Sequence, residues 1–90
     1  MEPKIWGPPG WKFLHSITFE YPEKPTNLDK EKYYTFFNSL KNVLPCPNCR
    51  IHYGQNLEKY PIKLETREEL IHWLIDIHNM VNQVNNKRKY

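Results

Sequence analysis

The sequence lacks long apolar segments. None of its 90 residues belongs to an apolar run that approaches the roughly 18–20 residues of a membrane-spanning helix. The first six residues, from Met1 to Trp6, also lack the apolar core of a secretory signal peptide. We therefore expect no membrane span and no signal peptide, and we expect the protein to act inside the cell, in the cytoplasm.

An excess of one charge is also missing. The chain has 13 basic and 10 acidic residues, for a formal net charge of +3, and the surplus lies largely in Lys87, Arg88 and Lys89. So small a surplus does not indicate a nucleic-acid partner. We interpret the basic tail as a solvated C-terminus, with contact to the phosphates of a ligand as the alternative.

Cysteine is limited to Cys46 and Cys49. In a reducing compartment, two cysteines are more often catalytic or metal-binding than structural. Pro47 is a good first helical residue, because its missing N–H would have no partner there. Cys46 would then be the helix N-cap, and the positive end of the helix dipole would face both sulfurs and favour their thiolates. The stretch predicts a redox-active dithiol.

A chain of 90 residues allows one small domain, which we take to span residues 1–90. The spacing of apolar residues predicts helices and no confident strand. We expect residues 1–10 to be irregular, with a first helix starting at Pro8 or Pro9, and we expect Asn27 and Thr66 to cap the second and fourth helices. The prediction is an all-α, small antiparallel four-helix bundle. The expected helices span about residues 8–21, 28–43, 47–59 and 67–86.

Apolar residues at three- and four-residue steps are expected to face the core. They are Trp11, Phe13, Leu14, Ile17 and Tyr21 in the first helix, Tyr33, Phe36, Phe37, Leu40 and Val43 or Leu44 in the second, and Leu70, Trp73, Leu74, Ile77, His78, Val81 and Val84 in the fourth.

Polar residues interrupt the fourth helix on one face, where His78 lies near Asn79 and Asn82. A lone histidine on an apolar face is more often a core residue with its hydrogen bonds satisfied. Buried imidazole and amide groups need partners, and they find them in each other or in the edge of a heteroaromatic ring. Because Trp11 and His15 share a face of the first helix, the set favours a flat organic ligand.

Zinc is the alternative reading of the cysteines. It would make the protein a non-catalytic, zinc-stabilised helical interaction module. Structural zinc usually takes two ligands from each of two tight pairs, and the sequence has only one such pair. Covalent haem attachment is excluded because Arg50, not histidine, follows the second cysteine. The zinc ligands would be Cys46, Cys49 and His52, with His15, His72 or His78 as the fourth.

In order, spacing and helical register, the chain resembles the Erv/ALR family of FAD-linked sulfhydryl oxidases, above all the short forms of large cytoplasmic DNA viruses. A CxxC motif alone is weak evidence, whereas a CxxC between a WxxxH and an HNxVN is specific. The resemblance covers nearly the whole chain. It is carried by Gly7 to His15, Pro45 to Tyr53, Lys59-Tyr60-Pro61, and Trp73 with His78-Asn79-x-Val81-Asn82.

The resemblance implies a four-helix bundle with a short extra helical turn and FAD held between the helices, in keeping with the absence of a GxGxxG motif. It implies that Cys49 is the sulfur next to the flavin and that Cys46 meets the substrate thiolate. The cofactor-binding residues it implies are Gly7, Trp11, Lys12, His15, His52, Tyr53, Trp73, His78, Asn79, Val81, Asn82 and Lys87.

The implied activity is oxidation of a thioredoxin-like or other dithiol protein, with O₂ as the electron acceptor and a homodimer formed through the first two helices. A viral member would act in the host cytoplasm or the virion. Two departures from the family pattern matter. Pro8 stands where many relatives have arginine, so Lys12 or the C-terminal basic residues would hold the phosphates. A second cysteine pair is missing, so electrons would enter Cys46 directly from another protein.

Overall fold

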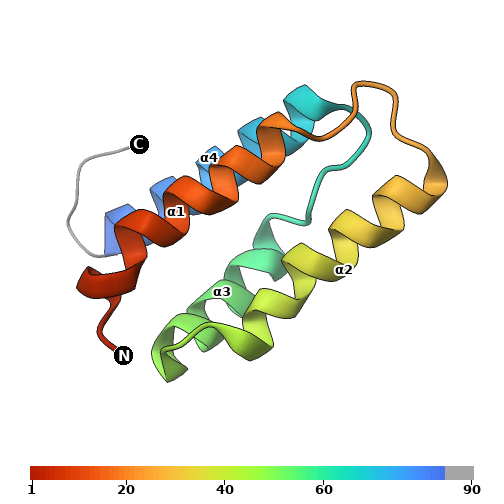
Figure 1. Ribbon diagram of the computed structural model, residues 1–90. Helices are drawn as coiled ribbons and strands as arrows, with labels where there is room; N and C mark the ends of the chain where they lie inside the picture. The colour runs from red at the N-terminus through yellow and green to blue at the C-terminus, as the bar shows by residue number, and fades with distance from the viewer. Residues whose placement is uncertain (85–90) are drawn as a thin grey trace.

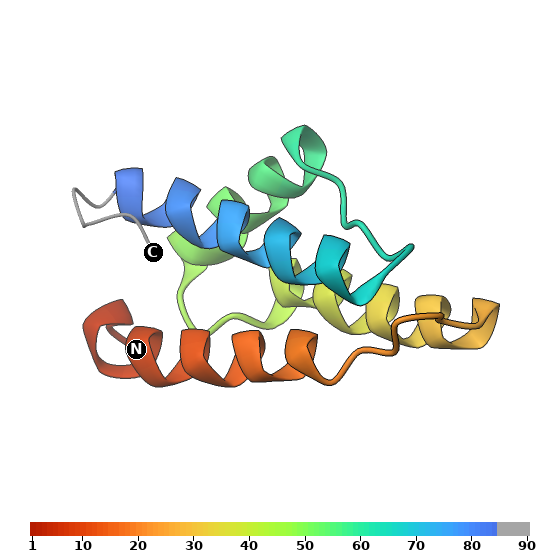
Figure 2. The same ribbon diagram turned by 90° about the horizontal axis from the view of Figure 1, so that it is seen from above.

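Four α-helices make up the fold in the computed structural model, which describes residues 1–84. They are α1 (Pro3–Phe19), α2 (Asn27–Val43), α3 (Pro47–Lys59) and α4 (Arg67–Val84). Successive helices run in opposite directions, with α1 beside α4 and α2 beside α3 (Figure 1). Seen from above, α1 and α2 lie on one side of the molecule and α3 and α4 on the other (Figure 2). The prediction of an all-α four-helix bundle is confirmed.

The first helix begins earlier than predicted. Residues 1–10 were expected to be irregular, but α1 begins at Pro3 and continues through Pro8 and Pro9. Proline is tolerated at the start of a helix, so Pro3 fits there, and the two later prolines remove only the bonds to the carbonyls of residues 4 and 5. Packing of Trp11, Leu14 and Ile17 against the core holds the rest of the helix. Within residues 1–84 there is no separate fifth helix to match the expected extra turn.

Capping residues set the other helix starts. Thr26, one residue before the predicted cap, begins α2 with a reciprocal capping box in which Thr26 and Asp29 each accept the other's backbone N–H. Cys46 caps α3 and Pro47 follows it, as predicted. The N–H of Glu69 donates to Thr66 Oγ1 at 3.1 Å, so the predicted start of α4 is confirmed. The predicted end of α4 near residue 86 lies outside the described residues.

The core lies where the four helices meet. Most of the predicted apolar positions belong to it, but Phe13, Phe36 and Val43 are exposed, with 64%, 37% and 62% of their surface accessible. Phe36 is next to the buried Phe37, and Leu44 packs inward in place of Val43. The side chain of Val84 lies outside the described part. The buried hydrophobic residues are Tyr21, Phe37, Leu40, Tyr53, Leu70, Trp73, Leu74 and Ile77.

Over residues 1–84, no helix combines the length and the apolarity that crossing a membrane requires.

Candidate functional site

The two cysteines lie where α2 gives way to α3, Cys46 in the connection between these helices and Cys49 in the first turn of α3, and we call residues 44–50 the dithiol turn. Leu44 is extended (φ −57°, ψ 138°), as expected for a residue that precedes proline. Cys46 is also extended (φ −159°, ψ 119°), and its N–H donates to the Leu44 carbonyl at 2.8 Å. The prolines before and after Cys46 thus end one helix and begin the next, and they place Cys46 at the N-cap of α3.

The two sulfurs are not equivalent. Cys46 Sγ accepts the backbone N–H of Cys49 at 3.3 Å. Hydrogen bonds from the Cys49 thiol and then from its N–H lower the pKa of Cys46 below that of an ordinary thiol. Burial, together with the bond donated to Cys46, raises the pKa of Cys49 to about 11. The helix N-terminus was expected to favour both thiolates, but at Cys49 burial and the bond to Cys46 outweigh its effect, so the two thiols differ in pKa.

Arg50 is part of the dithiol turn, although the sequence reasoning did not include it among the site residues. Its Nη1 donates to the Leu44 carbonyl at 2.5 Å, and its N–H donates to the Cys46 carbonyl at 3.1 Å. The signal that could have found it is its position in the first turn of α3, where a cation opposes the helix dipole. A guanidinium in that position is stabilised by a nearby hydrogen-bond acceptor, here the Leu44 carbonyl.

A second group of predicted site residues meets between α1 and α4, and we call Trp11, His15 and His78 the ring cluster. The indole of Trp11 stacks on His78, with ring centroids 4.0 Å apart and planes within 7°. His15 Nε2 lies 2.9 Å from His78 Nδ1, and both imidazoles are buried. Thr18, also buried, donates to the His15 carbonyl at 2.7 Å, which adds a bond to the helix at this point. The predicted sharing of a face by Trp11 and His15 is confirmed.

The buried imidazoles are suited to a neutral state. Burial lowers the pKa of His15, because an imidazolium in that place would lose its hydration. In a neutral pair one ring nitrogen donates and the other accepts, so the 2.9 Å contact needs no charge. The ring cluster is therefore a largely buried set of aromatic faces with polar edges, in which the His15 ring is tilted against the other two.

Other predicted cofactor-binding residues surround the ring cluster or lie away from it. On α4, Asn82 is buried, and Asn79 and Val81 are half-buried. On α1, Gly7 is buried and Lys12 is exposed. None of the described atoms lies within 4 Å of the place that a Cβ on Gly7 would occupy, other than its own neighbours.

Two predicted site residues belong to the core. The hydroxyl of Tyr53 donates to the Phe37 carbonyl at 2.6 Å, and the indole N–H of Trp73 donates to the Tyr60 carbonyl at 2.8 Å. Their polar atoms thus join α3 to α2 and α4 to the segment that follows α3. His52 is exposed on α3, and Lys87 lies outside the described residues.

The zinc alternative finds no support. Within residues 1–84, no three His, Cys, Asp or Glu side chains come together in a way that could hold a metal ion. His15 and His78, two of the candidate fourth ligands, are close to each other between α1 and α4.

Residues 8–90 of the chain match the family described as Erv1 / Alr. A probable FAD-linked sulfhydryl oxidase of Acanthamoeba polyphaga mimivirus is 50% identical over 91 residues, which cover 98% of this chain and 64% of that protein. An FAD-linked sulfhydryl oxidase of Saccharomyces cerevisiae is 33% identical over 84 residues, covering 93% of this chain and 43% of that protein. The chain thus spans less than two thirds of the length of either relative.

Solved structures show the same arrangement of helices. The yeast Erv1 core matches all of this chain with a TM-score of 0.94 at 30% identity, over 76% of the solved chain. The FAD binding domain of Erv1 from Saccharomyces cerevisiae matches it with a TM-score of 0.95 at 31% identity, over 86% of that domain. A family match over residues 8–90 and a fold shared with the Erv1 core lead to one conclusion: the chain belongs to the Erv1 / Alr family.

Proposed function

We propose that residues 1–90 form a single FAD-dependent thiol oxidase domain, which forms disulfides in a protein substrate and passes the electrons to O₂ (2 R–SH + O₂ → R–S–S–R + H₂O₂). The observation that carries this proposal is the pair of cysteines at the start of α3, with Cys46 Sγ at 3.3 Å from the Cys49 N–H. The names of the relatives support it, since they are FAD-linked sulfhydryl oxidases.

The chemistry of the ring cluster suits FAD. Flat indole and imidazole faces can stack on its rings, and the amides of Asn79 and Asn82 can bond to ring edges. When bound, FAD would supply the two-electron redox step between the dithiol and O₂. Residues proposed to hold it are those of the ring cluster with Gly7, His52, Tyr53, Trp73, Asn79, Val81 and Asn82, and Lys12 and Lys87 for the phosphates.

The chain's own residues would carry out thiol–disulfide exchange. A substrate thiolate attacks Cys46 Sγ of the Cys46–Cys49 disulfide, and Cys49 leaves with the electron pair of the broken S–S bond. Burial acts more strongly on Cys49 than on Cys46, which supports Cys46 as the sulfur that the substrate reaches. The N-terminus of α3 stabilises negative charge on the sulfurs during the exchange.

The proposed function is tested by measuring the absorbance, cofactor content and O₂ consumption of the purified full chain. An oxidase would be yellow, with a flavin absorbance band near ~450 nm and one FAD per chain, and would consume O₂ when a dithiol is added. Colourless protein that carries stoichiometric zinc and consumes no O₂ would overturn the proposal in favour of the zinc module.

The proposed cofactor site is tested by His78→Ala. We expect less FAD to be retained after gel filtration and a lower melting temperature, because a bound cofactor stabilises the folded state by mass action. The matched control is His72→Ala on the same helix. The imidazole of His72 is exposed, and its Nε2 lies 3.7 Å from a carboxylate oxygen of Glu68. Flavin content equal to that of the parent protein in His78→Ala would remove His78 from the site.

We propose in addition that a thioredoxin-like or other dithiol protein donates the electrons, and that the protein acts in the cytoplasm. The support for the compartment is the similarity to a viral protein. In Cys49→Ser, Cys46 can first be converted to a mixed disulfide with an aryl thiol by treatment with an aryl disulfide. A donor thiolate then displaces the aryl thiolate and becomes disulfide-bonded to Cys46, so pull-down under non-reducing conditions identifies the donor. Fractionation of cells that express the chain tests its location.

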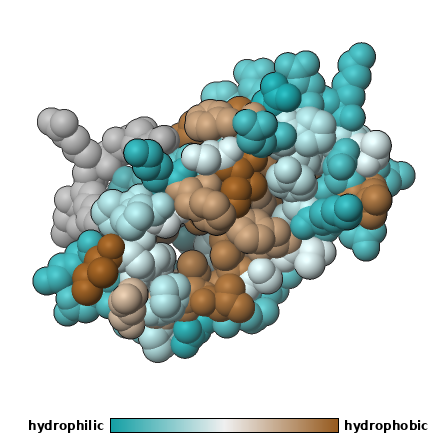
Figure 3. Space-filling model, viewed as in Figure 1, coloured by the Kyte–Doolittle hydropathy of each residue, from teal (hydrophilic) through white to brown (hydrophobic). Residues whose placement is uncertain are grey.

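We also propose a homodimer through α1 and α2. In Figure 3, apolar residues gather over the face that α1 and α2 form. Exposed large hydrophobic residues on the same two helices are Phe13 and Phe19 on α1 and Leu28 and Tyr34 on α2, each at least half accessible. Light scattering measures the oligomeric state, and Phe13→Glu is expected to shift it toward the monomer.

A further inference from the structure

Arg50 closes the dithiol turn on itself. Its Nη1 donates to the Leu44 carbonyl at 2.5 Å, and the same carbonyl accepts the N–H of Cys46 at 2.8 Å. From the other side, the Arg50 N–H donates to the Cys46 carbonyl at 3.1 Å. One side chain thus links the residue that follows Cys49 to the residue two places before Cys46, with both cysteines enclosed between them.

Arg50 lies at a position in the helix where an exposed arginine without a specific contact would be unfavourable. It lies in the first turn of α3, where the dipole favours anions and disfavours cations. The side chain is half-buried and borders an open groove between α2 and α3, together with Lys41 and Gly54. Lys41 puts a second cation on the same groove from the last turn of α2, where the dipole favours it.

We infer that Arg50 is a positioning residue of the exchange reaction, which keeps Cys46 at the N-cap through the Leu44 carbonyl and stabilises the Cys49 thiolate as it leaves. This inference rests on the proposed oxidase function. In the step concerned, a bond forms between the substrate sulfur and Cys46 Sγ. The Cys46–Cys49 bond breaks, and Cys49 takes the electron pair. The substrate dithiol is the reductant and the protein disulfide is the oxidant.

The electrostatics of the sulfurs support this role. Burial is the largest effect on the pKa of Cys49 and raises it, whereas the charge of Arg50 has a smaller effect and lowers it. A leaving thiol of lower pKa leaves faster in thiol–disulfide exchange. Removal of the charge would therefore slow the step in which Cys49 departs.

Two substitutions separate the contact from the charge. Arg50→Gln removes the charge and keeps an amide donor, whereas Arg50→Lys keeps the charge and loses the planar fork. In the full chain with FAD bound, we expect Arg50→Gln to lower the rate of dithiol oxidation by about 3-fold, because a leaving thiol of higher pKa leaves more slowly. Flavin content should stay the same, and Arg50→Lys should recover part of the rate. Lys41→Gln removes a nearby charge of the same sign and should leave the rate unchanged.

A second readout does not depend on turnover. In a Cys46→Ser background, serine still caps α3, and alkylation of Cys49 by iodoacetamide reports its thiolate fraction. Adding Arg50→Gln should move the pH profile of alkylation upward, and Arg50→Lys should move it back. An unchanged profile together with an unchanged oxidation rate would overturn the inference. If the parent protein carries no flavin and consumes no O₂, the oxidase proposal fails, and the alkylation profile alone then decides whether Arg50 acts on the dithiol.

Discussion

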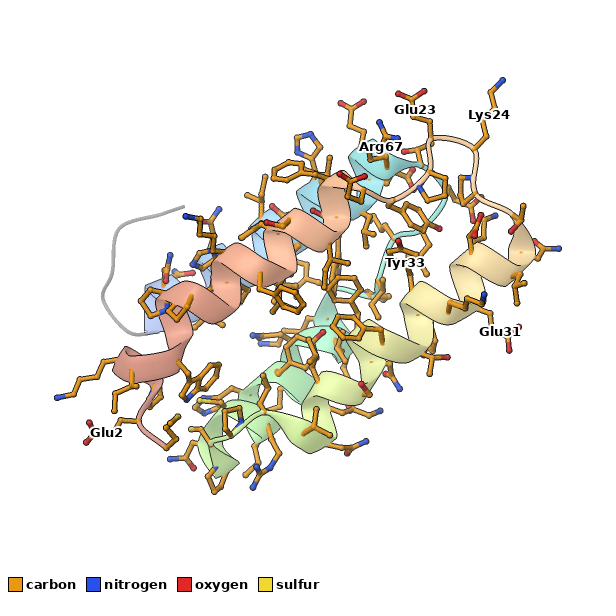
Figure 4. All side chains as sticks on the ribbon, viewed as in Figure 1. Glu2, Glu23, Lys24, Glu31, Tyr33 and Arg67 are labelled. Atoms are coloured by element: carbon orange, nitrogen blue, oxygen red, sulfur yellow. The ribbon has the colours of Figure 1, made fainter. Side chains whose placement is uncertain are left out.

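The two ends of the bundle are held by the same kind of contact, with different surroundings. At the end where α4 begins, Arg67 Nε donates to the Tyr21 carbonyl at 2.5 Å, and at the dithiol end Arg50 donates to the Leu44 carbonyl over the same distance. Figure 4 shows Arg67 next to Glu23, and their charged groups lie 3.3 Å apart. Tyr21 is fully buried there, and its hydroxyl donates to the Leu64 carbonyl at 2.7 Å.

The comparison shows that the role of an arginine–carbonyl contact depends on the residues around it. The Arg67 end joins two connections, residues 20–26 and 60–66, around a buried tyrosine, so the contact there supports the fold. The Arg50 end encloses two half-buried sulfurs, so the contact there is proposed to act on the exchange reaction. If this division is right, substitutions at one end should change chemistry and substitutions at the other should change stability.

The largest expected effect is that of Cys49→Ser. Serine cannot form the Cys46–Cys49 disulfide, so dithiol-dependent O₂ consumption should fall by at least about 100-fold, the scale of losing an essential reacting group. We expect FAD to stay bound, because the ring cluster lies on α1 and α4. Oxygen-electrode traces and the absorbance spectrum of the same sample measure both. Full activity in this variant would show that the dithiol is not the route of the electrons.

The second prediction concerns pH and distinguishes the two sulfurs. In the reduced protein the pKa of Cys46 is lowered. Its thiolate should therefore form, and its alkylation should speed up, at a lower pH than for an ordinary cysteine. The pKa of Cys49 is raised to about 11, so Cys49 should stay protonated and unreactive until the pH approaches that value. Peptide mapping after brief iodoacetamide treatment at a series of pH values measures this order. Preferential labelling of Cys49 near pH 7 would contradict it.

Local signals in the sequence predicted much of the fold and of the dithiol. Pro47 after Cys46 predicted the N-cap of α3, and Thr66 with Glu69 predicted the start of α4. Both depend on residues close in sequence, where backbone rules suffice. The contact between His15 and His78 joins residues 63 positions apart. The sequence showed that both helices carry polar residues, but the distance between these two side chains depends on how the helices pack.

What the sequence did not predict depends on tertiary contacts. The start of α1 at Pro3 went against the proline signal because the helix that follows packs on the core. The raised pKa of Cys49 follows from burial, which a helix dipole argument leaves out. Arg50 became a site residue only when its contact with Leu44 was seen. Each of these outcomes was decided by packing that a single stretch of sequence does not contain.

The smallest expected effect is at the Arg67 end. Arg67→Ala leaves the Tyr21 carbonyl without its charged donor, and we expect a loss of about 1–3 kcal/mol in the free energy of unfolding, measured by urea denaturation. The rate of dithiol oxidation below the melting temperature should not change. Glu23→Gln is the matched control, because Glu23 is well exposed and a surface pair contributes at most about 1 kcal/mol. If Arg67→Ala slowed oxidation as much as Arg50→Gln while both proteins stayed folded, the two ends would not differ in role, and the effect of Arg50 would then have to come from the stability of the bundle as a whole.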